Sequence, residues 1–394
     1  MPADTDRSTG DVGNMAKILF VSNTDGAQFK FRGSLMRRLV DRGHAVTSIA
    51  SYDSPEGCYL DKLKDRCTST ISTEFLRRGP TGYLKTIGFV WRHLGCNTYD
   101  IVHCFGHEAA VPIMLARRQL GDARLFVTLT GLGRAYANDA SFPAAIARAA
   151  LNRLYRHSRR RVDKFIFLNA DDLDELSIAA ELPKNRCIQV MGEGFVDPVG
   201  IGDKGSVRNS SVEHGEIKIL FAGRLMRDKG ILDLIEAAGR TTNSRLHFVV
   251  AGSIDEDLRE ASEIRELLDG DVPNASYVGY VSNIRSLIEE CHAVILPTRY
   301  REGLPRSLIE GLAFDKYIIT TDAPGARETV RDGRNGVVLR SGDVAQLVAF
   351  LDRLEPRIIE ESRGRSRELF LKEFEQEIIN ARMFQLYFPD VVSR

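Results

Sequence analysis

"IKILFAGRLMRDKGILDLIEAAG", residues 217–239, contains the arrangement that decides the fold. An apolar, partly β-branched run is followed by the basic segment RLMRDKG and then by a segment whose apolar residues recur at helical spacing. A buried strand, a short turn and a helix in this order form the repeating unit of a parallel α/β sheet. We therefore expect further units of this kind on both sides of residues 217–239.

Similar strand-like runs recur along the chain, with helical segments between them. They occupy residues 17–23, 45–51, 101–106, 125–131, 164–169, 187–194, 246–252, 275–281, 293–298, 317–322 and 336–340. This alternation predicts an α/β fold with two parallel sheets, each flanked by helices in a Rossmann-like domain. Ligands of such sheets bind beyond the carboxyl ends of the strands, so two domains facing each other would define a cleft.

Length and composition suggest where the domains begin and end. A chain of 394 residues exceeds what one core usually organises. Residues 196–216 are rich in Gly, Ser and charge without a stable period, which predicts a linker. The polar residues 1–15 are expected to be a disordered tail. We expect an N-terminal domain over 16–195, a C-terminal domain over 217–372 and a final helix within 373–394 that packs back toward the N-terminal domain.

The totals exclude several classes of protein. Lys+Arg and Asp+Glu number 54 each, so no overall field favours nucleic acid as a partner. The six cysteines contain no C-x-x-C pair and are expected to be reduced cytosolic thiols. No apolar run approaches the roughly 18–20 residues that a membrane-spanning helix needs, and the N-terminus does not resemble a secretory signal. We therefore expect a cytoplasmic protein whose electrostatic function is local.

Two cations follow the first strand of the second domain. Arg224 and Lys229 lie in the turn, with Gly230 directly before the predicted helix. Cationic side chains beside the unpaired N–H groups of a helix N-terminus form an anion site that suits a diphosphate. The alternative is that Arg224 pairs with a carboxylate such as Asp228 and that Lys229 is solvated.

A second predicted helix start lies in LPTRYREGLPRSLIEGLA, residues 296–313. Pro305 suits the first helical position, which would leave the next N–H groups, including that of Ser307, pointing outward unpaired. Gly303 allows a backbone to approach a ligand closely. Glu302 would repel a phosphate, so its expected partner is a hydroxyl. Glu310 lies about 80° further round the helix and can line the same wall, unless it is simply a surface residue.

Taken together, EGLPRSLIEGLA and AGRLMRDKG resemble the retaining GT-B glycosyltransferases of family 4. The resemblance covers nearly the whole chain. SNTDGAQFKFRGSL at 22–35, TGLGRAY at 130–136 and TTDAPGARETVRDGRNGVVL at 320–339 are similar to the branch that makes bacterial capsule, O-antigen and lipid-linked glycans. The resemblance implies transfer of a sugar, of the hexosyltransferase type, from a nucleoside-diphosphate sugar such as a UDP-sugar to a glycan or lipid-linked saccharide.

The resemblance also implies roles for individual residues. Arg224 and Lys229 would bind the donor diphosphate as catalytic cations. Glu302, the third catalytic residue, would contact hydroxyls of the donor sugar, and Glu310 would bind the ribose. Further donor-binding positions of the family match Gly303, Leu304, Ser307 and Tyr280.

The same resemblance implies how the reaction proceeds. Retention would occur by same-face displacement, with the leaving diphosphate oxygen helping to deprotonate the acceptor, and no nucleophile is assigned. Because the cations and helix N-termini stand in for a metal, and no Asp-x-Asp pair is placed at a strand end to bind one, we expect no metal. The nucleotide sugar is a substrate, so no cofactor is expected.

The N-terminal domain departs from the family pattern. Residues 22–28 lack the usual double glycine, so Gln28 is expected to face the acceptor, or to belong to an ordinary loop. Where many relatives carry a histidine near the donor sugar, this chain has Thr130. His103 and His107 end the strand at 101–106 and can either reach the cleft or be satisfied core residues.

Residues Arg148–Arg161 form a basic stretch without any acidic residue. Arginines alternate there with apolar residues, as in basic amphipathic helices at anionic membrane surfaces. Peripheral binding at the inner face of the cell membrane would bring the enzyme to a lipid-linked acceptor. The alternative is a solvated helix face whose arginines cover the sheet edge.

Three other functions of proteins with Rossmann-like domains are the alternatives to glycosyl transfer. A dehydrogenase needs G-x-G-x-x-G directly after a strand, and no predicted strand is followed by one. A sugar-nucleotide epimerase of the same architecture would convert the donor without an acceptor. A non-catalytic nucleotide-binding scaffold would not hydrolyse the donor at all.

Overall fold

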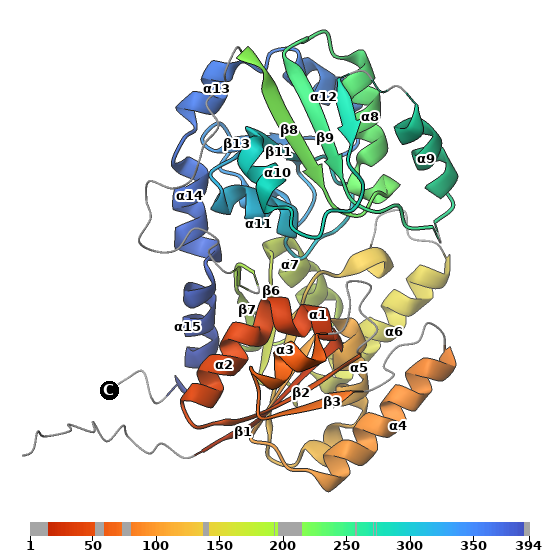
Figure 1. Ribbon diagram of the computed structural model, residues 1–394. Coiled ribbons are helices and arrows are strands. Elements are labelled where there is room, and N and C mark those ends of the chain that lie inside the picture. The colour runs from red at the N-terminus through yellow and green to blue at the C-terminus, as the bar shows by residue number, and fades with distance from the viewer. Residues whose placement is uncertain are drawn as a thin grey trace, which may run out of the picture. The chain divides into compact units, whose positions relative to one another are not determined.

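We describe a computed structural model of the chain (Figure 1). The structure describes residues 15–51, 59–72, 80–136, 142–192, 194–195, 215–256, 258–270, 272 and 274–389. Nearly all of the predicted tail and of the predicted linker lies outside these residues. The chain forms two compact units, which we call the first unit, Met1–Val127 with Arg161–Asp163, and the second unit, Thr128–Arg160 with Lys164–Arg394.

The N-terminal half contains a seven-stranded sheet with the order β3-β2-β1-β4-β5-β6-β7. Its strands are β1 (Lys17–Thr24), β2 (Ala45–Ser51), β3 (Ser69–Ser72), β4 (Ile101–Phe105), β5 (Arg124–Leu129), β6 (Lys164–Phe167) and β7 (Cys187–Gln189). Within the first unit, β1 pairs in parallel with both β2 and β4. Strand β3 was not predicted, because its sequence STIS is short and mostly hydroxylic; it pairs with β2 at the sheet edge.

The C-terminal half contains a six-stranded parallel sheet with the order β10-β9-β8-β11-β12-β13. Its strands are β8 (Ile217–Ala222), β9 (Leu246–Ala251), β10 (Ala275–Tyr277), β11 (Ala293–Leu296), β12 (Tyr317–Thr321) and β13 (Gly336–Leu339). Numbered within the sheet, this is the doubly wound order 3-2-1-4-5-6. The predicted α/β fold with two Rossmann-like halves is confirmed, and the strand order reverses between β8 and β11.

Helices connect the strands in both halves. The α-helices are α1 (Asp25–Ala27), α2 (Gly33–Asp41), α3 (Leu60–Lys64), α4 (Pro80–Cys96), α5 (His107–Leu115), α6 (Phe142–Ser158), α7 (Ala170–Ala179), α8 (Ile231–Arg240), α9 (Ala261–Asp269), α10 (Arg285–Glu290), α11 (Arg306–Ala313), α12 (Val344–Leu351), α13 (Pro356–Glu361), α14 (Arg365–Leu369) and α15 (Gln376–Tyr387). In the second unit α8 packs beside α12, and α11 packs beside α14.

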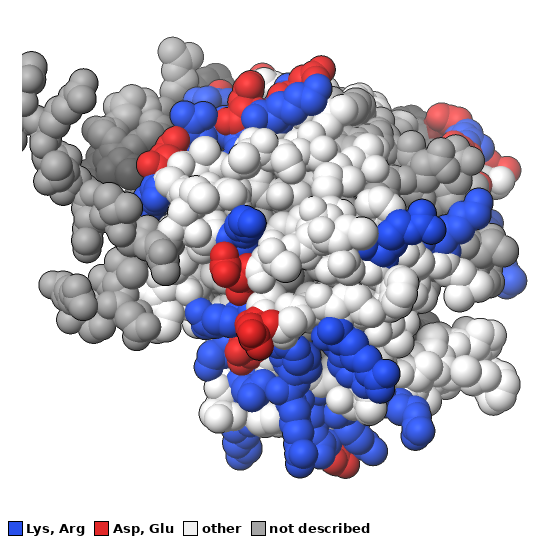
Figure 2. Space-filling model, turned by 90° about the horizontal axis from the view of Figure 1, so that it is seen from below, with Lys and Arg blue, Asp and Glu red and all other residues white. Residues whose placement is uncertain are grey.

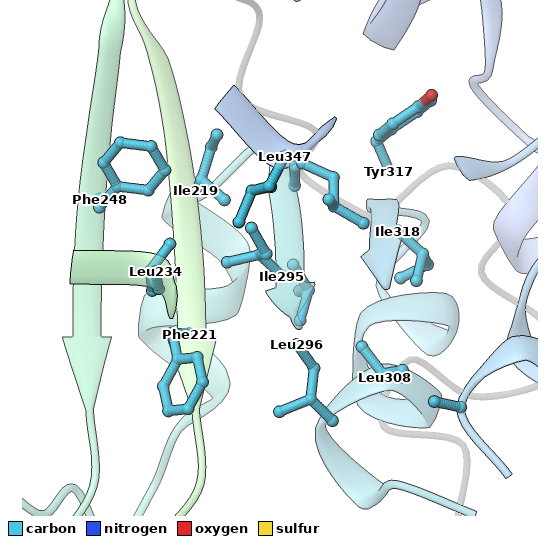
Figure 3. Close-up of a cluster of buried hydrophobic side chains, with 14 of the residues drawn as sticks. Ile219, Phe221, Leu234, Phe248, Ile295, Leu296, Leu308, Tyr317, Ile318 and Leu347 are labelled. Carbon is cyan, nitrogen blue, oxygen red and sulfur yellow. The ribbon is translucent and has the colours of Figure 1, made fainter. Parts of the chain in front are cut away.

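The core of the C-terminal sheet shows why helices cover both of its faces. Along β8, Ile219 and Phe221 belong to one buried cluster, which also contains Leu234 of α8 (Figure 3). The alternate residue Leu220 belongs to a second cluster with Ile288 of α10. Successive side chains of a strand point to opposite faces of the sheet, so this strand is buried on both sides and its sequence, IKILFA, is apolar except at Lys218.

The predicted C-terminal helix is interrupted at Glu375. Residues Phe370–Phe374 form a π-helical turn, and Glu375 adopts an extended conformation with φ −61° and ψ 140°. Its carboxylate then accepts hydrogen bonds from the N–H groups of Glu377 and Ile378, at 2.8 and 3.3 Å, and so caps α15. Glu375 also forms an isolated bridge with Phe195, which places the start of α15 beside the residues that follow β7.

Surface composition is uneven although the charges balance over the whole chain. Figure 2 shows Lys and Arg gathered along one margin of the displayed face, with few Asp or Glu among them. Within the described part of the chain, no helix is long and apolar enough to cross a membrane. Five cysteines that the structure describes are free thiols: Cys67, Cys96, Cys104, Cys187 and Cys291.

Candidate active site

The turn after β8 is fastened to the loop after the neighbouring strand β11. The carbonyl of Asp228 accepts hydrogen bonds from the backbone N–H groups of Arg299 and Tyr300, at 2.8 and 3.0 Å. Gly230 precedes α8 with φ +81°, and a Cβ atom there would lie 2.0 Å from the carbonyl oxygen of Pro297. The position therefore requires glycine, and the two loops meet where the strand order of the sheet reverses.

Lys229 and Glu302 form an ion pair at this meeting point. The ammonium group of Lys229 donates a hydrogen bond to the Glu302 carboxylate, and the two side chains are only 15% and 12% exposed. The ammonium also lies 5.8 Å from the ring centroid of Tyr300, within cation–π range. Lys229 is therefore not a solvated lysine, and the partner of Glu302 in this structure is an ammonium group rather than a hydroxyl.

Arg224, the other predicted cation, is much more accessible. Its guanidinium lies 3.7 Å from the carboxylate of Asp255, and its side chain is 58% exposed. The carboxylate that it approaches is therefore Asp255 and not Asp228. An exposed pair at this distance contributes at most about 1 kcal/mol, so Arg224 loses little when it turns toward another anion.

Glu310 is buried, so the alternative that it is a surface residue is wrong. It is 8% exposed and accepts a hydrogen bond of 2.8 Å from Nε of Arg306, one turn earlier in α11. The helix begins at Arg306. Pro305 was predicted to be the first helical residue but is the N-cap, with ψ 120°. No side chain of the described residues caps this N-terminus. The first turn of α11 thus keeps a positive end of the helix dipole.

Backbone from the N-terminal half holds the loop that contains Glu302. A Cβ atom at Gly303 would lie 2.2 Å from the carbonyl oxygen of Thr130, so no larger residue fits there without a shift. The predicted contact residue Thr130 therefore meets this loop through its backbone. Leu304 packs partly buried against the core, and Ser307 is half-buried in the first turn of α11.

Asn169 was not predicted, and it makes direct contact with the same loop. It is fully buried, and its Nδ2 group donates hydrogen bonds to the carbonyl oxygens of Glu302 and Gly303 at 3.0 and 3.2 Å. Its Oδ1 atom accepts from the N–H of Asp172 at 2.8 Å and caps α7. The sequence NADD after a strand indicates this N-cap. The contact with Glu302, 133 residues away, has no local signal.

Arg301 extends the same network. Its guanidinium donates to Asp172 at 3.0 Å and pairs with Glu175 at 2.7 Å. Asp172 is buried and also accepts from the N–H of Leu132 at 3.2 Å. Arg301 and the backbone of Glu302 and Gly303 are therefore held by α7 and its N-cap, which fixes the backbone from which the Glu302 side chain extends.

Tyr280 lies in the loop after β10, where it is largely exposed. The carbonyl of the preceding residue, Gly279, accepts a hydrogen bond of 2.8 Å from the N–H of Gly252 at the end of β9. This places the loop at the carboxyl edge of the sheet, the edge at which the turns after β8 and β11 also lie.

The weaker candidates belong to the first unit. Gln28 is fully buried and donates to Ser48 at 3.3 Å. His103 is fully buried, with its ring centroid 4.0 Å from that of Phe105. Burial, and secondarily the charge of Arg32, lowers the pKa of His103 well below its usual value. His103 therefore has the surroundings of a core histidine. His107 is half-buried at the start of α5.

Among the residues that the structure describes, no three His, Cys, Asp or Glu side chains gather closely enough to hold a metal ion. Metal independence stays a prediction.

Most of the chain is similar to known glycosyltransferase domains. Residues 203–363 match the family model of glycosyl transferases group 1, and residues 30–190 match the glycosyl transferase 4-like domain. The chain is a glycosyltransferase with a 4-like domain followed by a group 1 domain. The predicted resemblance is confirmed, and Arg224, Lys229 and Glu302 all lie within the group 1 match.

Similarity to individual proteins extends over nearly the whole chain. The chain is 25% identical to the N,N'-diacetylbacillosaminyl-diphospho-undecaprenol alpha-1,3-N-acetylgalactosaminyltransferase of Campylobacter jejuni, over 94% of this chain and 98% of that protein. The structure of a Rickettsia africae glycosyltransferase superimposes with a TM-score of 0.74, at 18% identity, covering 96% of this chain and 99% of that one. The structure of Anabaena HepE in complex with UDP-glucose superimposes with a TM-score of 0.69 at 17% identity, and the match covers 94% of this chain and 99% of that one. These structures share the GT-B fold.

Proposed function

We propose that this glycosyltransferase transfers a hexose-type sugar, with retention, from a UDP-sugar to a lipid-linked saccharide during synthesis of a bacterial surface polysaccharide. The Lys229–Glu302 pair carries the proposal: a cation and a carboxylate, both largely buried, meet where the strand order reverses. Support for the donor comes from HepE, whose structure contains UDP-glucose. Support for the acceptor comes from the C. jejuni relative, whose name specifies an undecaprenol-linked substrate.

The cations of the site suit the charge that develops as the donor bond breaks. Departure of a nucleoside diphosphate concentrates negative charge on phosphate oxygens, and preorganised positive groups stabilise that charge most in the transition state. Lys229 is held in place by its neighbours, while Arg224 is free to move toward the diphosphate. The uncapped N-terminus of α11 adds a third positive element. These groups would perform the task of a metal, so no metal is required.

The two carboxylates suit the hydroxyl groups of the donor. A diphosphate bound to Lys229 competes with Glu302 for the ammonium group, which leaves the Glu302 carboxylate to accept from a sugar hydroxyl. Arg306 orients Glu310, whose second oxygen would accept from the ribose. Asn169 fixes the Glu302 backbone while this exchange occurs.

Retention in our proposal needs no carboxylate nucleophile. The leaving phosphate oxygen takes the proton of the acceptor hydroxyl. At the same time the hydroxyl oxygen bonds to the anomeric carbon on the face from which the diphosphate leaves. The sugar–phosphate bond breaks, and the diphosphate leaves with its electron pair. The acceptor would be met at the cytoplasmic face of the membrane, where the protein binds peripherally.

One experiment tests the proposal against its alternatives. Purified protein is incubated with a panel of nucleotide sugars, with and without a polyprenol-diphosphate saccharide, and products are separated by chromatography. We expect one UDP-sugar to yield UDP and a lengthened lipid-linked saccharide with an α-linkage conserved from the donor. Conversion of the sugar nucleotide without release of UDP would indicate an epimerase, and binding without any conversion would indicate a scaffold.

A further inference from the structure

Helix α6 exposes apolar and basic residues on the same face. Phe142 and Ile146 are 79% and 56% exposed, whereas Tyr155 and Ser158 are fully buried. A helix advances by about 100° per residue, so Phe142, Ile146 and Arg153 lie within about 40° of one another, opposite Tyr155. Two apolar side chains at the start of this face are followed by the cation Arg153 nearer its end. We call this face the α6 stripe.

The basic end of the α6 stripe borders a hollow of about 420 Å³. The residues that line it are all basic: Arg153, Arg156, His157, Arg159 and Arg160. Glu181 neutralises part of this charge, since it pairs with Arg159 at 2.7 Å and with Arg156 at 3.4 Å. Among the described residues, Arg153 and Arg160 have no carboxylate partner. The hollow therefore retains a net positive charge in a chain whose total charge is zero.

We propose that the α6 stripe binds the surface of an anionic membrane. The basic hollow would hold phosphate groups of phospholipids, and Phe142 and Ile146 would insert among the headgroups. Exposed apolar side chains in line with cations suit an interface that is negatively charged outside and apolar beneath. A soluble acidic ligand would use the cations and leave Phe142 and Ile146 in water. The inference deepens the proposed function and rests on it, because it names the surface at which a lipid-linked acceptor would be met.

Sedimentation of the full chain with vesicles tests this inference. The vesicles are phosphatidylcholine alone, or phosphatidylcholine with one quarter phosphatidylglycerol. Two variants alter the two parts of this surface: R153E/R160E changes the basic hollow, and F142S/I146S changes the apolar start of the stripe. Matched controls change exposed residues elsewhere, R353E/R357E for charge and L267S for apolar surface. Thermal unfolding and hydrolysis of the donor are measured for every protein.

We expect the wild type and both controls to pellet with the anionic vesicles only, and to be released by high salt because the charges are screened. Both stripe variants should lose at least tenfold in partitioning, with unchanged donor hydrolysis. Equal pelleting with uncharged vesicles, no pelleting of the wild type, or equal loss in the controls would overturn the inference. So would normal pelleting of F142S/I146S combined with displacement by free inorganic phosphate, which would indicate a site for soluble anions.

The two proposals fail in distinguishable ways. A protein that cleaves the donor but ignores anionic vesicles would refute the α6 stripe and leave the transferase intact. A protein that binds vesicles through the stripe but never cleaves a nucleotide sugar would refute the transferase instead.

Discussion

The ammonium group of Lys229 donates a hydrogen bond to the carboxylate of Glu302 and so joins the turn after β8 to the loop after β11. The pair lies where the sheet order reverses, which is where open α/β sheets bind ligands. Its two members have different expected tasks, one toward phosphate and one toward a sugar hydroxyl. That difference allows a catalytic role of the pair to be distinguished from a purely structural role.

Lys229→Met and Glu302→Gln should each lower kcat by about 10²–10³, because each removes a contact to the transition state. The double variant distinguishes the two interpretations. A structural pair can be replaced on both sides at little cost, so activity would then return in the double variant. We expect it to stay as inactive as the worse single variant, with melting temperatures showing that all three proteins fold.

Asn169→Asp should separate helix capping from loop positioning. Aspartate is an equally good N-cap, so the start of α7 is preserved. It cannot donate to the carbonyl oxygens of Glu302 and Gly303 or to the Asp172 carboxylate, which Nδ2 of Asn169 contacts at 3.1 Å, and loss of a buried donor costs roughly 1–3 kcal/mol. We expect a large fall in kcat together with a fall in melting temperature, because two buried carboxylates then face each other. Wild-type kinetics in this variant would show that Asn169 does not position the loop.

Gly303→Ala should destabilise the protein and lower its activity, because the added methyl group would lie 2.2 Å from the carbonyl oxygen of Thr130. Gly239→Ala in α8 is the matched control. Nothing lies within 4 Å of the Cβ that it adds, and alanine in a helix is favoured by up to about 1 kcal/mol. Chemical denaturation of both variants should therefore give shifts of opposite sign.

Lys316 should make stability depend on alkaline pH. Burial lowers its pKa from 10.5 to about 8, so between these values the unfolded chain binds more protons than the folded chain. Its contribution to the free energy of unfolding should be constant below pH 8, rise with pH up to about 10.5, and be constant again above. The melting temperature of the wild type minus that of Lys316→Met should rise between pH 7 and 10. Parallel curves would contradict the prediction.

Metal independence is tested by dialysis against a chelator. Because the cations of the site would perform the task of a metal, dialysis should leave kcat unchanged. Added divalent ions should change kcat by less than about twofold. Complete loss of activity that manganese restores would contradict the prediction.

The sequence predicted most of the fold because most of the strands are short, predominantly apolar and separated by segments of helical periodicity. Strand β3 was missed since STIS contains one apolar residue in four. The break at Glu375 was also missed, because apolar residues continue at helical spacing on both sides of it and the break depends on pairing with Phe195.

Prediction of the site had a similar limit. Lys229, Glu302 and Glu310 were identified from their position at loop and helix starts, together with family resemblance. Their partners in the structure were not, because each partner depends on side-chain geometry. Asn169 marks the limit clearly: its cap is local and predictable, whereas its hydrogen bond to Glu302 joins segments 133 residues apart.

A crystal structure of the protein with UDP tests the central claim most directly. We predict that the diphosphate lies within hydrogen-bonding distance of the Lys229 ammonium and the N-terminus of α11, with the ribose hydroxyls on Glu310. Nucleotide bound at any other place, with the Lys229–Glu302 pair undisturbed, would contradict the account.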